Sequence, residues 1–141
     1  MHRLNFAKES YVETIYSLTC MQGSASVTDI ARVLEIKPSS VTEMLRKLDD
    51  MDYVNYQPYR NVTLTVKGEE LAVFLKKAKL SLKTFFVLLN MSEQVAEEDA
   101  CKVEHMINIT TLKNLSAFVE TIQNTQQGKA LLQVFKKTTL K

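Results

Sequence analysis

Three side chains that commonly bind metals lie close together in the stretch ACKVEHM at residues 100–106. Cys101 is followed by Glu104 three positions later and by His105 four positions later. On a helix these positions share one face, so a thiolate, a carboxylate and an imidazole could converge on one ion. This donor set suits a divalent transition metal such as Fe, Mn, Co or Zn. The alternative is a packed helix whose cysteine is a small buried hydrophobe.

Glu13 and Ser10 offer the further oxygen ligands that such a site needs. They are one turn apart on a predicted helix near the N-terminus and point along the same face. Catalysis is a poorer interpretation, because a cysteine and a histidine on one helix, without a glycine-rich oxyanion turn, make a poor active site. The residues alone therefore predict that the chain is not an enzyme, and they leave a metal site and a packed helix as the two alternatives.

The composition indicates a mainly helical globular protein. The chain has 141 residues, 45% of them hydrophobic, with only 3 Gly and 2 Pro, which allows one compact domain or two small ones. It has neither an apolar leader nor a run of about 18 uncharged apolar residues, so we expect a cytoplasmic protein without a membrane partner. In a reducing cytosol Cys20 and Cys101 are expected to stay thiols.

Helical periodicity and capping residues predict three helices in the first half of the chain. Apolar residues recur at helical spacing over residues 9–21. Ser26 with Asp29 resembles a capping box ahead of a short second helix. After a tight turn, a third helix begins at Pro38 or Ser39. The two short helices form a predicted helix-turn-helix.

The stretch DYVNYQPYRNVTLT at residues 52–65 then changes to β-branched and aromatic residues around a turn, which predicts a β-hairpin, or wing. Helix, helix-turn-helix and hairpin is the order of a winged helix-turn-helix DNA-binding domain. Hydroxyls and the start of the third helix would bind phosphates, cations would neutralise them, and Glu43 could accept from cytosine. The alternative is a solvated helix with a serine cap. The expected DNA contacts are Lys37, Pro38, Ser39, Ser40, Thr42, Glu43, Arg46, Lys47 and Arg60.

The rest of the chain is predicted to be helical and to form a second domain. A long helix runs from residue 66 to about residue 89, Ser92 caps the next, and two more follow at 110–122 and 126–139. Apolar residues crowd the end of the long helix, and we expect them to be buried against a second copy of the chain. The predicted domains are residues 1–70 for DNA binding and 71–141 for dimerisation and metal binding.

Charge alone does not identify a DNA-binding protein here. Residues 1–70 have 8 Lys and Arg against 10 Asp and Glu, a net charge of −2, whereas residues 71–141 have 10 against 6, a net charge of +4. Binding to double-stranded operator DNA is therefore expected to need a homodimer, which doubles the local cationic contacts.

Four motifs in this order resemble the diphtheria toxin repressor and manganese transport regulator family of metal-activated repressors. They are ESYVETIY, VTDIARVLEIKPSSVTEMLRKLD, YRNVTLTVKGEELA and EEDACKVEH, and they extend over nearly the whole chain. The two-domain manganese-regulator branch is the most similar, since the chain stops at Lys141 without a third, barrel-like domain. The resemblance implies a winged helix-turn-helix domain followed by a helical dimerisation and metal-binding domain.

The resemblance also implies a ligand set. It makes Cys101, Glu104 and His105 metal ligands together with Glu13. At the position of Cys101, some family members have Cys and others have Glu. Ser10 stands where the family has Asp or Met, and a neutral hydroxyl is a weaker ligand. Mn²⁺ and Fe²⁺ are the favoured ions, with Zn²⁺ and Co²⁺ as alternatives.

One position departs more strongly from the family. Members carry a histidine on the linker helix that serves a second metal, but Ala78 and Lys79 occupy the corresponding positions here. An ammonium has no lone pair to give to a metal, so we predict one metal per subunit. We expect Lys79 or Lys83 to pair with an acid at positions 97–99 and to replace the second cation.

These patterns predict a cytoplasmic, homodimeric, metal-dependent repressor of metal-uptake or homeostasis genes, without a small-molecule substrate. One alternative is a winged-helix regulator whose drifted site ignores metals or responds to oxidation of Cys101. Another is a metal-buffering protein or minor metalloenzyme that does not bind DNA.

Overall fold

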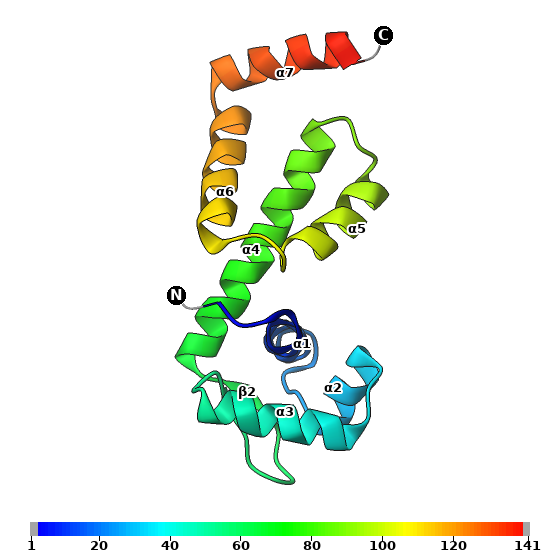
Figure 1. Ribbon diagram of the computed structural model, residues 1–141, viewed down its shortest axis with the longest axis vertical. Coiled ribbons are helices and arrows are strands. Elements are labelled where there is room, and N and C mark those ends of the chain that lie inside the picture. The colour runs from blue at the N-terminus through cyan, green and yellow to red at the C-terminus, as the bar shows by residue number, and fades with distance from the viewer. Residues whose placement is uncertain (1–2, 140–141) are drawn as a thin grey trace. The chain divides into compact units, whose positions relative to one another are not determined.

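The computed structural model describes residues 3–139 and divides the chain into two compact units, Met1–Leu75 (unit 1) and Lys76–Lys141 (unit 2). The described residues form seven helices and one two-stranded sheet (Figure 1). The predicted mainly α fold, with helix, helix-turn-helix and hairpin in that order, is confirmed. None of the described helices is long and apolar enough to cross a membrane.

Unit 1 begins with a helix that forms the centre of its core. Helix α1 spans Phe6–Gln22 and ends at Gly23, whose φ of 81° is the left-handed conformation that glycine adopts without strain. Val12 and Ile15 have no exposed surface. The predicted helix at residues 9–21 and its end near Gly23 are confirmed, and α1 begins a turn earlier than the apolar pattern indicated.

The helix-turn-helix consists of α2 (Val27–Leu34) and α3 (Pro38–Asp50). The Ser26 hydroxyl accepts the Asp29 backbone N–H at 3.1 Å and donates to the Asp29 carboxylate at 2.6 Å, so the predicted cap is present. Glu35, with a φ of 55°, turns the chain between the helices. Three α3 residues one turn apart are fully buried and hold α3 against the core: Val41, Leu45 and Leu48.

The wing consists of two very short strands. Strands β1 (Val54–Asn55) and β2 (Thr63–Leu64) pair antiparallel, and Val62 forms an isolated bridge with Ala25. The hairpin was predicted, although only two residues of each strand pair. The intervening residues form the loop that projects past α3 in Figure 1. The Ala25–Val62 bridge holds the hairpin next to the helix-turn-helix of unit 1.

Helix α4 (Val66–Leu88) starts in unit 1 and continues into unit 2. Its first turns pack into the core of unit 1 through Leu71, Ala72 and Leu75. A Cβ at Gly68 would lie 2.0 Å from the Tyr53 carbonyl oxygen, so only glycine allows this close approach of helix and hairpin.

Unit 2 contains the rest of α4 and three further helices, α5 (Glu93–Val103), α6 (Ile109–Asn124) and α7 (Gln126–Thr139). Ser92 caps α5 by accepting the Val95 backbone N–H, as predicted. The predicted helices at 110–122 and 126–139 are also confirmed. Its described buried hydrophobic residues are few, and three of the seven are alanines: Ala78, Leu82, Ala96, Ala100, Leu112, Val119 and Ile122.

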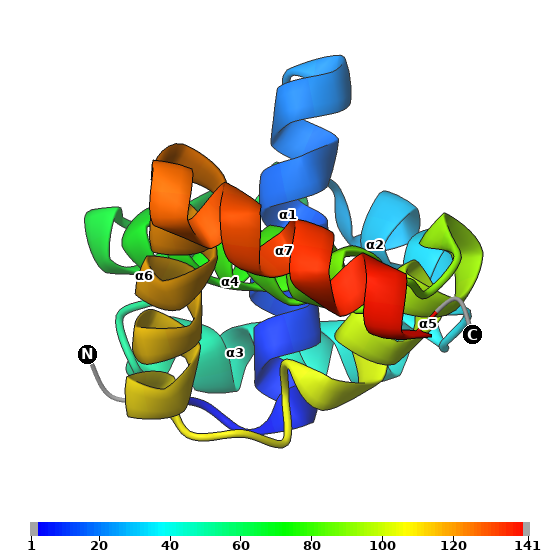
Figure 2. The ribbon, with the colours of Figure 1, turned by 90° about the horizontal axis from the view of Figure 1, so that it is seen from above.

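Helices α6 and α7 meet at a sharp turn, and Figure 2 shows α7 crossing over unit 2 from the end of α6. Gly128 makes the turn possible, because a Cβ there would lie 2.3 Å from the Ile122 carbonyl oxygen. At the other end of α7, the Asn90 amide donates to the Thr139 hydroxyl at 2.6 Å. This bond ties the end of α7 to the loop after α4.

Candidate metal centre and nucleic-acid interface

The candidate ligands of unit 1 lie on α1. Ser10 and Glu13 are half-buried, one turn apart, on a helix that Val12 and Ile15 anchor in the core. The Ser10 hydroxyl donates to the Phe6 carbonyl oxygen at 3.0 Å, so its proton is engaged within its own helix. Of these two oxygen donors, the Glu13 carboxylate is the stronger ligand for a divalent cation.

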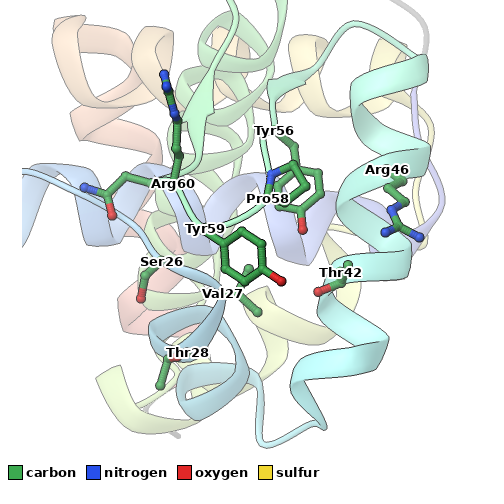
Figure 3. Close-up of a pocket in the computed structure, with 10 residues that line it drawn as sticks. Ser26, Val27, Thr28, Thr42, Arg46, Tyr56, Pro58, Tyr59 and Arg60 are labelled. Carbon is green, nitrogen blue, oxygen red and sulfur yellow. The ribbon is translucent and has the colours of Figure 1, made fainter.

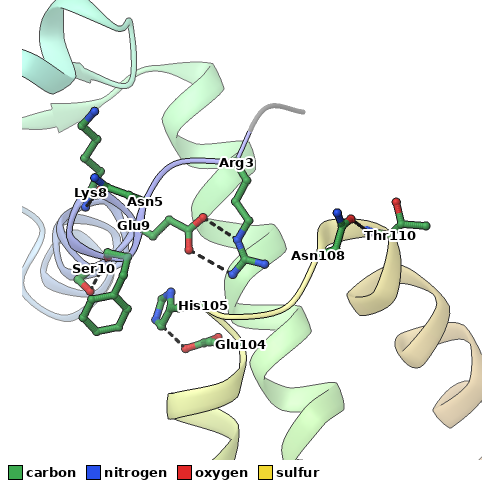
Figure 4. A network of polar contacts seen from close by, with 10 residues as sticks. Arg3, Asn5, Lys8, Glu9, Ser10, Glu104, His105, Asn108 and Thr110 are labelled. Carbon is green, nitrogen blue, oxygen red and sulfur yellow. Dashed lines mark hydrogen bonds and ion pairs between the residues drawn. The ribbon is translucent and has the colours of Figure 1, made fainter.

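A buried ion pair precedes these residues and was not predicted from the sequence. The Arg3 guanidinium donates to both carboxylate oxygens of Glu9, at 3.0 and 3.3 Å (Figure 4). The Glu9 side chain has no exposed surface. This two-point contact ties the segment before α1 to the helix. An arginine six positions before a glutamate gives no periodic signal, so the pair is visible only in three dimensions.

The candidate ligands of unit 2 include a buried carboxylate and imidazole in contact. The Glu104 Oε1 and His105 Nε2 atoms are 3.2 Å apart, with side chains 2% and 6% exposed (Figure 4). Two ligand atoms that each lie about 2.1 Å from one ion are separated by about 3 Å, so this pair fits a shared divalent metal. Helix α5 ends at Val103 with Glu104 as its cap, which puts His105 beyond the helix that was expected to carry it.

Cys101 lies one turn earlier on α5 and has other neighbours. Its thiol is 4.0 Å from a Glu97 carboxylate oxygen, and it interacts electrostatically with the Lys79 side chain. The structure thus brings Glu104 and His105 together and places Cys101 beside Glu97 and Lys79. Its place among the ligands remains a prediction.

Two lysines of α4 neutralise the acid on this part of α5. The Lys79 and Lys83 ammoniums lie 3.8 and 3.1 Å from the two Glu97 carboxylate oxygens. Burial tends to lower the pKa of Lys79, but its interaction with Cys101 and the negative charges of Glu104 and Glu97 raise that pKa overall. Lys79 therefore stays cationic at neutral pH. The lysine–acid pairing that the sequence suggested is present, with Glu97 as the partner.

The predicted DNA contacts all lie on unit 1, on α3, in the turn before it and on the wing. Thr42 is half-buried and the other eight residues are exposed. Lys47 donates to Glu43 at 2.8 Å, and this hydrogen bond and the lysine charge lower the pKa of the Glu43 carboxyl. The pair neutralises the Lys47 charge, so Arg46 carries the net positive charge of this stretch of α3. Arg46 on α3 and Arg60 on the wing both line the cleft between these elements.

A cleft of about 470 Å³ separates α2 and α3 from the wing (Figure 3). The sequence predicted Thr42, Arg46 and Arg60 as contacts, but not the other residues that line the cleft: Ser26, Val27, Thr28, Tyr56, Pro58, Tyr59 and Asn61. The aromatic and hydroxyl residues around the QPYRN turn were the only feature of the sequence that could have indicated these additional cleft residues. Their common surface depends on how the hairpin folds next to α2.

Comparison with known proteins assigns a family to these two units. The family model described as iron dependent repressor, N-terminal DNA binding domain, matches residues 3–62. A second, described as iron dependent repressor, metal binding and dimerisation domain, matches residues 65–132. The chain belongs to the iron-dependent repressor family. This membership confirms the resemblance to the diphtheria toxin repressor and manganese regulator proteins.

The similar proteins of this family include regulators that the match covers over more than nine tenths of their length. An uncharacterised HTH-type transcriptional regulator of Methanocaldococcus jannaschii is 42% identical over 120 residues, which cover 82% of this chain and 94% of the relative. The regulator MntR of Bacillus subtilis is 32% identical over 131 residues, covering 93% and 92%.

Solved structures show the same fold. A hypothetical protein from Sulfolobus solfataricus aligns with a TM-score of 0.69 and 25% identity over 82% of this chain and 89% of that chain. The manganese regulator SloR aligns with a TM-score of 0.66 and 28% identity over 84% of this chain, which spans 55% of SloR.

These relatives decide between the functional classes that the sequence left open. This iron-dependent repressor is a metal-dependent, DNA-binding transcriptional regulator and not an enzyme. The matched DNA-binding domain excludes a metal-buffering protein without DNA binding. A regulator that ignores metals, or responds only to thiol oxidation, is not favoured by the matched metal-binding domain.

Proposed function

We propose that this iron-dependent repressor acts in the cytosol as a homodimer and represses genes of metal-ion uptake or homeostasis when a divalent metal is bound. The observation that carries this proposal is the buried contact between Glu104 and His105, 3.2 Å apart, in the unit that matches the metal-binding domain. A carboxylate and an imidazole held this close and shielded from water suit a transition metal.

The proposed ligands come from both units. Glu104 and His105 form the centre of the set, Cys101 adds a thiolate, and Glu13 and the weaker Ser10 add oxygens from α1. A bound metal supplies positive charge that holds these anionic and neutral donors together. Such a ligand set would couple the DNA-binding unit to the dimerisation unit. A shift from mostly inactive to mostly active protein requires the metal to prefer the active form by roughly 5 kcal/mol.

Manganese or iron is the proposed ion, with one ion per subunit. The neighbouring Glu97 carboxylate is already neutralised by Lys79 and Lys83, at 3.8 and 3.1 Å, which supports a fixed cation in place of a second metal. The name of SloR, a manganese regulator 28% identical to this chain, favours manganese. A thiolate from Cys101 would favour iron or zinc.

Exposed apolar residues of unit 2 support the homodimer. They lie on α4, α5, α6 and α7 and in the turns that follow α4 and α5: Leu80, Leu89, Val95, Met106, Phe118, Leu131 and Val134. A second copy of the unit would remove them from water. Two recognition surfaces at fixed spacing would then engage double-stranded operator DNA through the nine residues from Lys37 to Arg60 named above.

Metal-dependent DNA binding tests the proposal directly. We expect Mn²⁺ to tighten binding of the native protein to a duplex selected from its own genome by at least tenfold in fluorescence anisotropy, relative to chelator. Glu104→Gln should remove this response, because an amide is a poor ligand. Glu98→Gln, an exposed acid on the same helix, serves as the matched control and should keep it. Equal affinity of the native protein in metal and in chelator would refute the proposal.

Metal titration tests the stoichiometry separately. Isothermal titration of the native protein with Mn²⁺ should end at one ion per subunit. Lys79→His replaces the ammonium with an imidazole ligand and should allow a second ion. Lys77→His places the same new ligand at an exposed position paired with Glu120 and should leave the stoichiometry unchanged. If Lys79→His still bound one ion per subunit, the explanation that the Lys79 ammonium replaces a second metal would be wrong.

A further inference from the structure

Helix α1 carries two acids one turn apart, Glu9 and Glu13. Side chains at this spacing share one side of a helix, with about 5–6 Å between their Cβ atoms, so two such carboxylates can bind the same divalent cation. Glu13 is half-buried and is one of the proposed ligands, whereas the Glu9 side chain has no exposed surface. Unit 1 therefore contains a further potential metal ligand beside Glu13.

The Arg3 guanidinium occupies the Glu9 carboxylate. It donates to both carboxylate oxygens, at 3.0 and 3.3 Å, and Figure 4 shows the two contacts side by side. Burial raises the pKa of the Tyr53 phenol, and the nearby Glu9 charge adds to this rise, so Tyr53 also lies close to the carboxylate. A guanidinium stays protonated at every physiological pH, and a two-point contact shielded from water is hard to displace. Glu9 is therefore engaged by a permanent cation of the protein.

The residues that follow Arg3 fix its position. Leu4 is 8% exposed and belongs to the hydrophobic core of unit 1. The Asn5 side chain caps α1 by accepting the Lys8 backbone N–H at 3.1 Å. These contacts tie the segment before α1 to the rest of unit 1. The guanidinium is thus held at Glu9 by its neighbours in the chain as well as by its own hydrogen bonds.

We propose that Arg3 is a specificity-determining residue of the metal centre: it withholds the Glu9 carboxylate, so that α1 contributes the Glu13 carboxylate without that of Glu9. The inference rests on the proposed function, because it requires a metal at Glu13. Carboxylate oxygens favour Mn²⁺, whereas thiolate and imidazole ligands favour Zn²⁺ and other late metals. One carboxylate fewer makes the site less selective for Mn²⁺. The pair of Arg3 and Glu9 therefore sets the balance between Mn²⁺ and the competing metals.

Unit 2 shows a looser version of the same arrangement. Lys79 and Lys83 approach the Glu97 carboxylate at 3.8 and 3.1 Å. Those three side chains are between 30% and 47% exposed, whereas Glu9 has no exposed surface. Loss of the cation beside a buried carboxylate leaves an uncompensated charge, so Glu9 should bind a metal more readily than Glu97 once its partner is removed. Arg3 is therefore the sharper position for a test.

Metal titration of the full-length protein tests the inference, with Mn²⁺ and Zn²⁺ used in separate experiments. Arg3→Gln removes the charge and keeps an amide donor. We expect its Mn²⁺ affinity to rise about tenfold, because Glu9 becomes an additional ligand, while its Zn²⁺ affinity changes by less than about threefold. The stoichiometry should stay at one ion per subunit. Lys8→Gln removes a neighbouring cation of α1 as the matched control and should keep both native affinities.

A double variant separates the Glu9 ligand from a general effect of charge. Arg3→Gln combined with Glu9→Gln lacks the additional carboxylate, so its Mn²⁺ affinity should return to within about threefold of the native value. If the gain persisted in the double variant, it would come from the lost positive charge and the inference would be wrong. A native ratio of Mn²⁺ to Zn²⁺ affinity in Arg3→Gln would overturn it as well.

Thermal unfolding keeps the test valid where the variant is unstable without metal. Arg3→Gln should melt at a lower temperature than the native protein in chelator, because Glu9 loses its cation. Mn²⁺ should then raise the melting temperature of Arg3→Gln by more than that of the native protein, since the variant binds the ion more tightly. Arg3→Lys retains a cation and should show the native shift. An equal or smaller shift in Arg3→Gln would show that the pair is purely structural.

The inference and the proposed function fail in different ways. If Mn²⁺ tightens DNA binding of the native protein, and Arg3→Gln keeps the native preference between Mn²⁺ and Zn²⁺, the proposed function stands and the role of Arg3 is refuted. If Arg3→Gln gains Mn²⁺ affinity through Glu9 while Mn²⁺ leaves DNA binding unchanged, the role of Arg3 is supported and the metal switch is refuted.

Discussion

The fully buried hydrophobic residues of unit 1 include Ile15, Ile30 and Leu45, whereas those in the described part of unit 2 are Ala96, Ala100 and Leu112. Unit 1 therefore forms its core from large side chains of α1, α2 and α3. Unit 2 buries fewer large side chains and leaves others such as Phe118 and Leu131 exposed. Unit 1 can be stable by itself, whereas unit 2 needs another surface to cover its apolar residues.

The strongest test of this contrast removes a large buried side chain from unit 1. Leu45→Ala leaves a cavity at a position without exposed surface and should lower the free energy of unfolding of unit 1 by about 3 kcal/mol. Chemical denaturation followed by circular dichroism measures the change. The effect should not depend on protein concentration. A loss below about 1 kcal/mol would mean that the core of unit 1 is loosely packed.

The next largest effect is expected at the exposed surface of unit 2. Phe118 is 51% exposed and stacks edge-on near Phe85, with ring centroids 6.5 Å apart. Phe118→Asp places a charge there and should weaken the dimer by about 2 kcal/mol, or roughly thirtyfold. Sedimentation equilibrium measures it. Lys113→Asp, on the same helix at an exposed polar position, is the control. An unchanged dimer would place the interface elsewhere.

The smallest expected effect concerns a helix cap. Ser92→Ala removes the acceptor for the Val95 backbone N–H, 3.3 Å away, and should cost unit 2 about 1 kcal/mol. Ser92→Asp retains an acceptor and should restore most of this loss. Thermal unfolding at fixed protein concentration measures both variants. Equal stability of Ser92→Ala and the native protein would show that the start of α5 is held by its packing.

Local signals allowed most helices to be predicted from the sequence. Ser26 and Ser92 cap the helices that they were expected to cap, and the tight turn is the one in which Glu35 takes a positive φ. These features depend on residues a few positions apart. The end of α5 was placed too late, because a helical period continues through His105 although the helix stops at Val103.

The candidate sites were less predictable, because they depend on contacts between distant residues. Spacing pointed to Glu104 and His105 together, and the structure brings them into contact. The same spacing did not show that Cys101 lies beside Lys79, or that Arg3 reaches Glu9. The cleft between the wing, α2 and α3 was equally hidden, since it forms only when the hairpin folds next to these helices.

The central claim is that metal binding and DNA binding are coupled in this protein. Thermodynamic linkage requires each ligand to raise the affinity for the other by the same factor. Isothermal titration with Mn²⁺ should therefore show tighter metal binding in the presence of the selected duplex, by the factor by which Mn²⁺ tightens DNA binding. A Mn²⁺ affinity that is the same with and without the duplex would contradict the account.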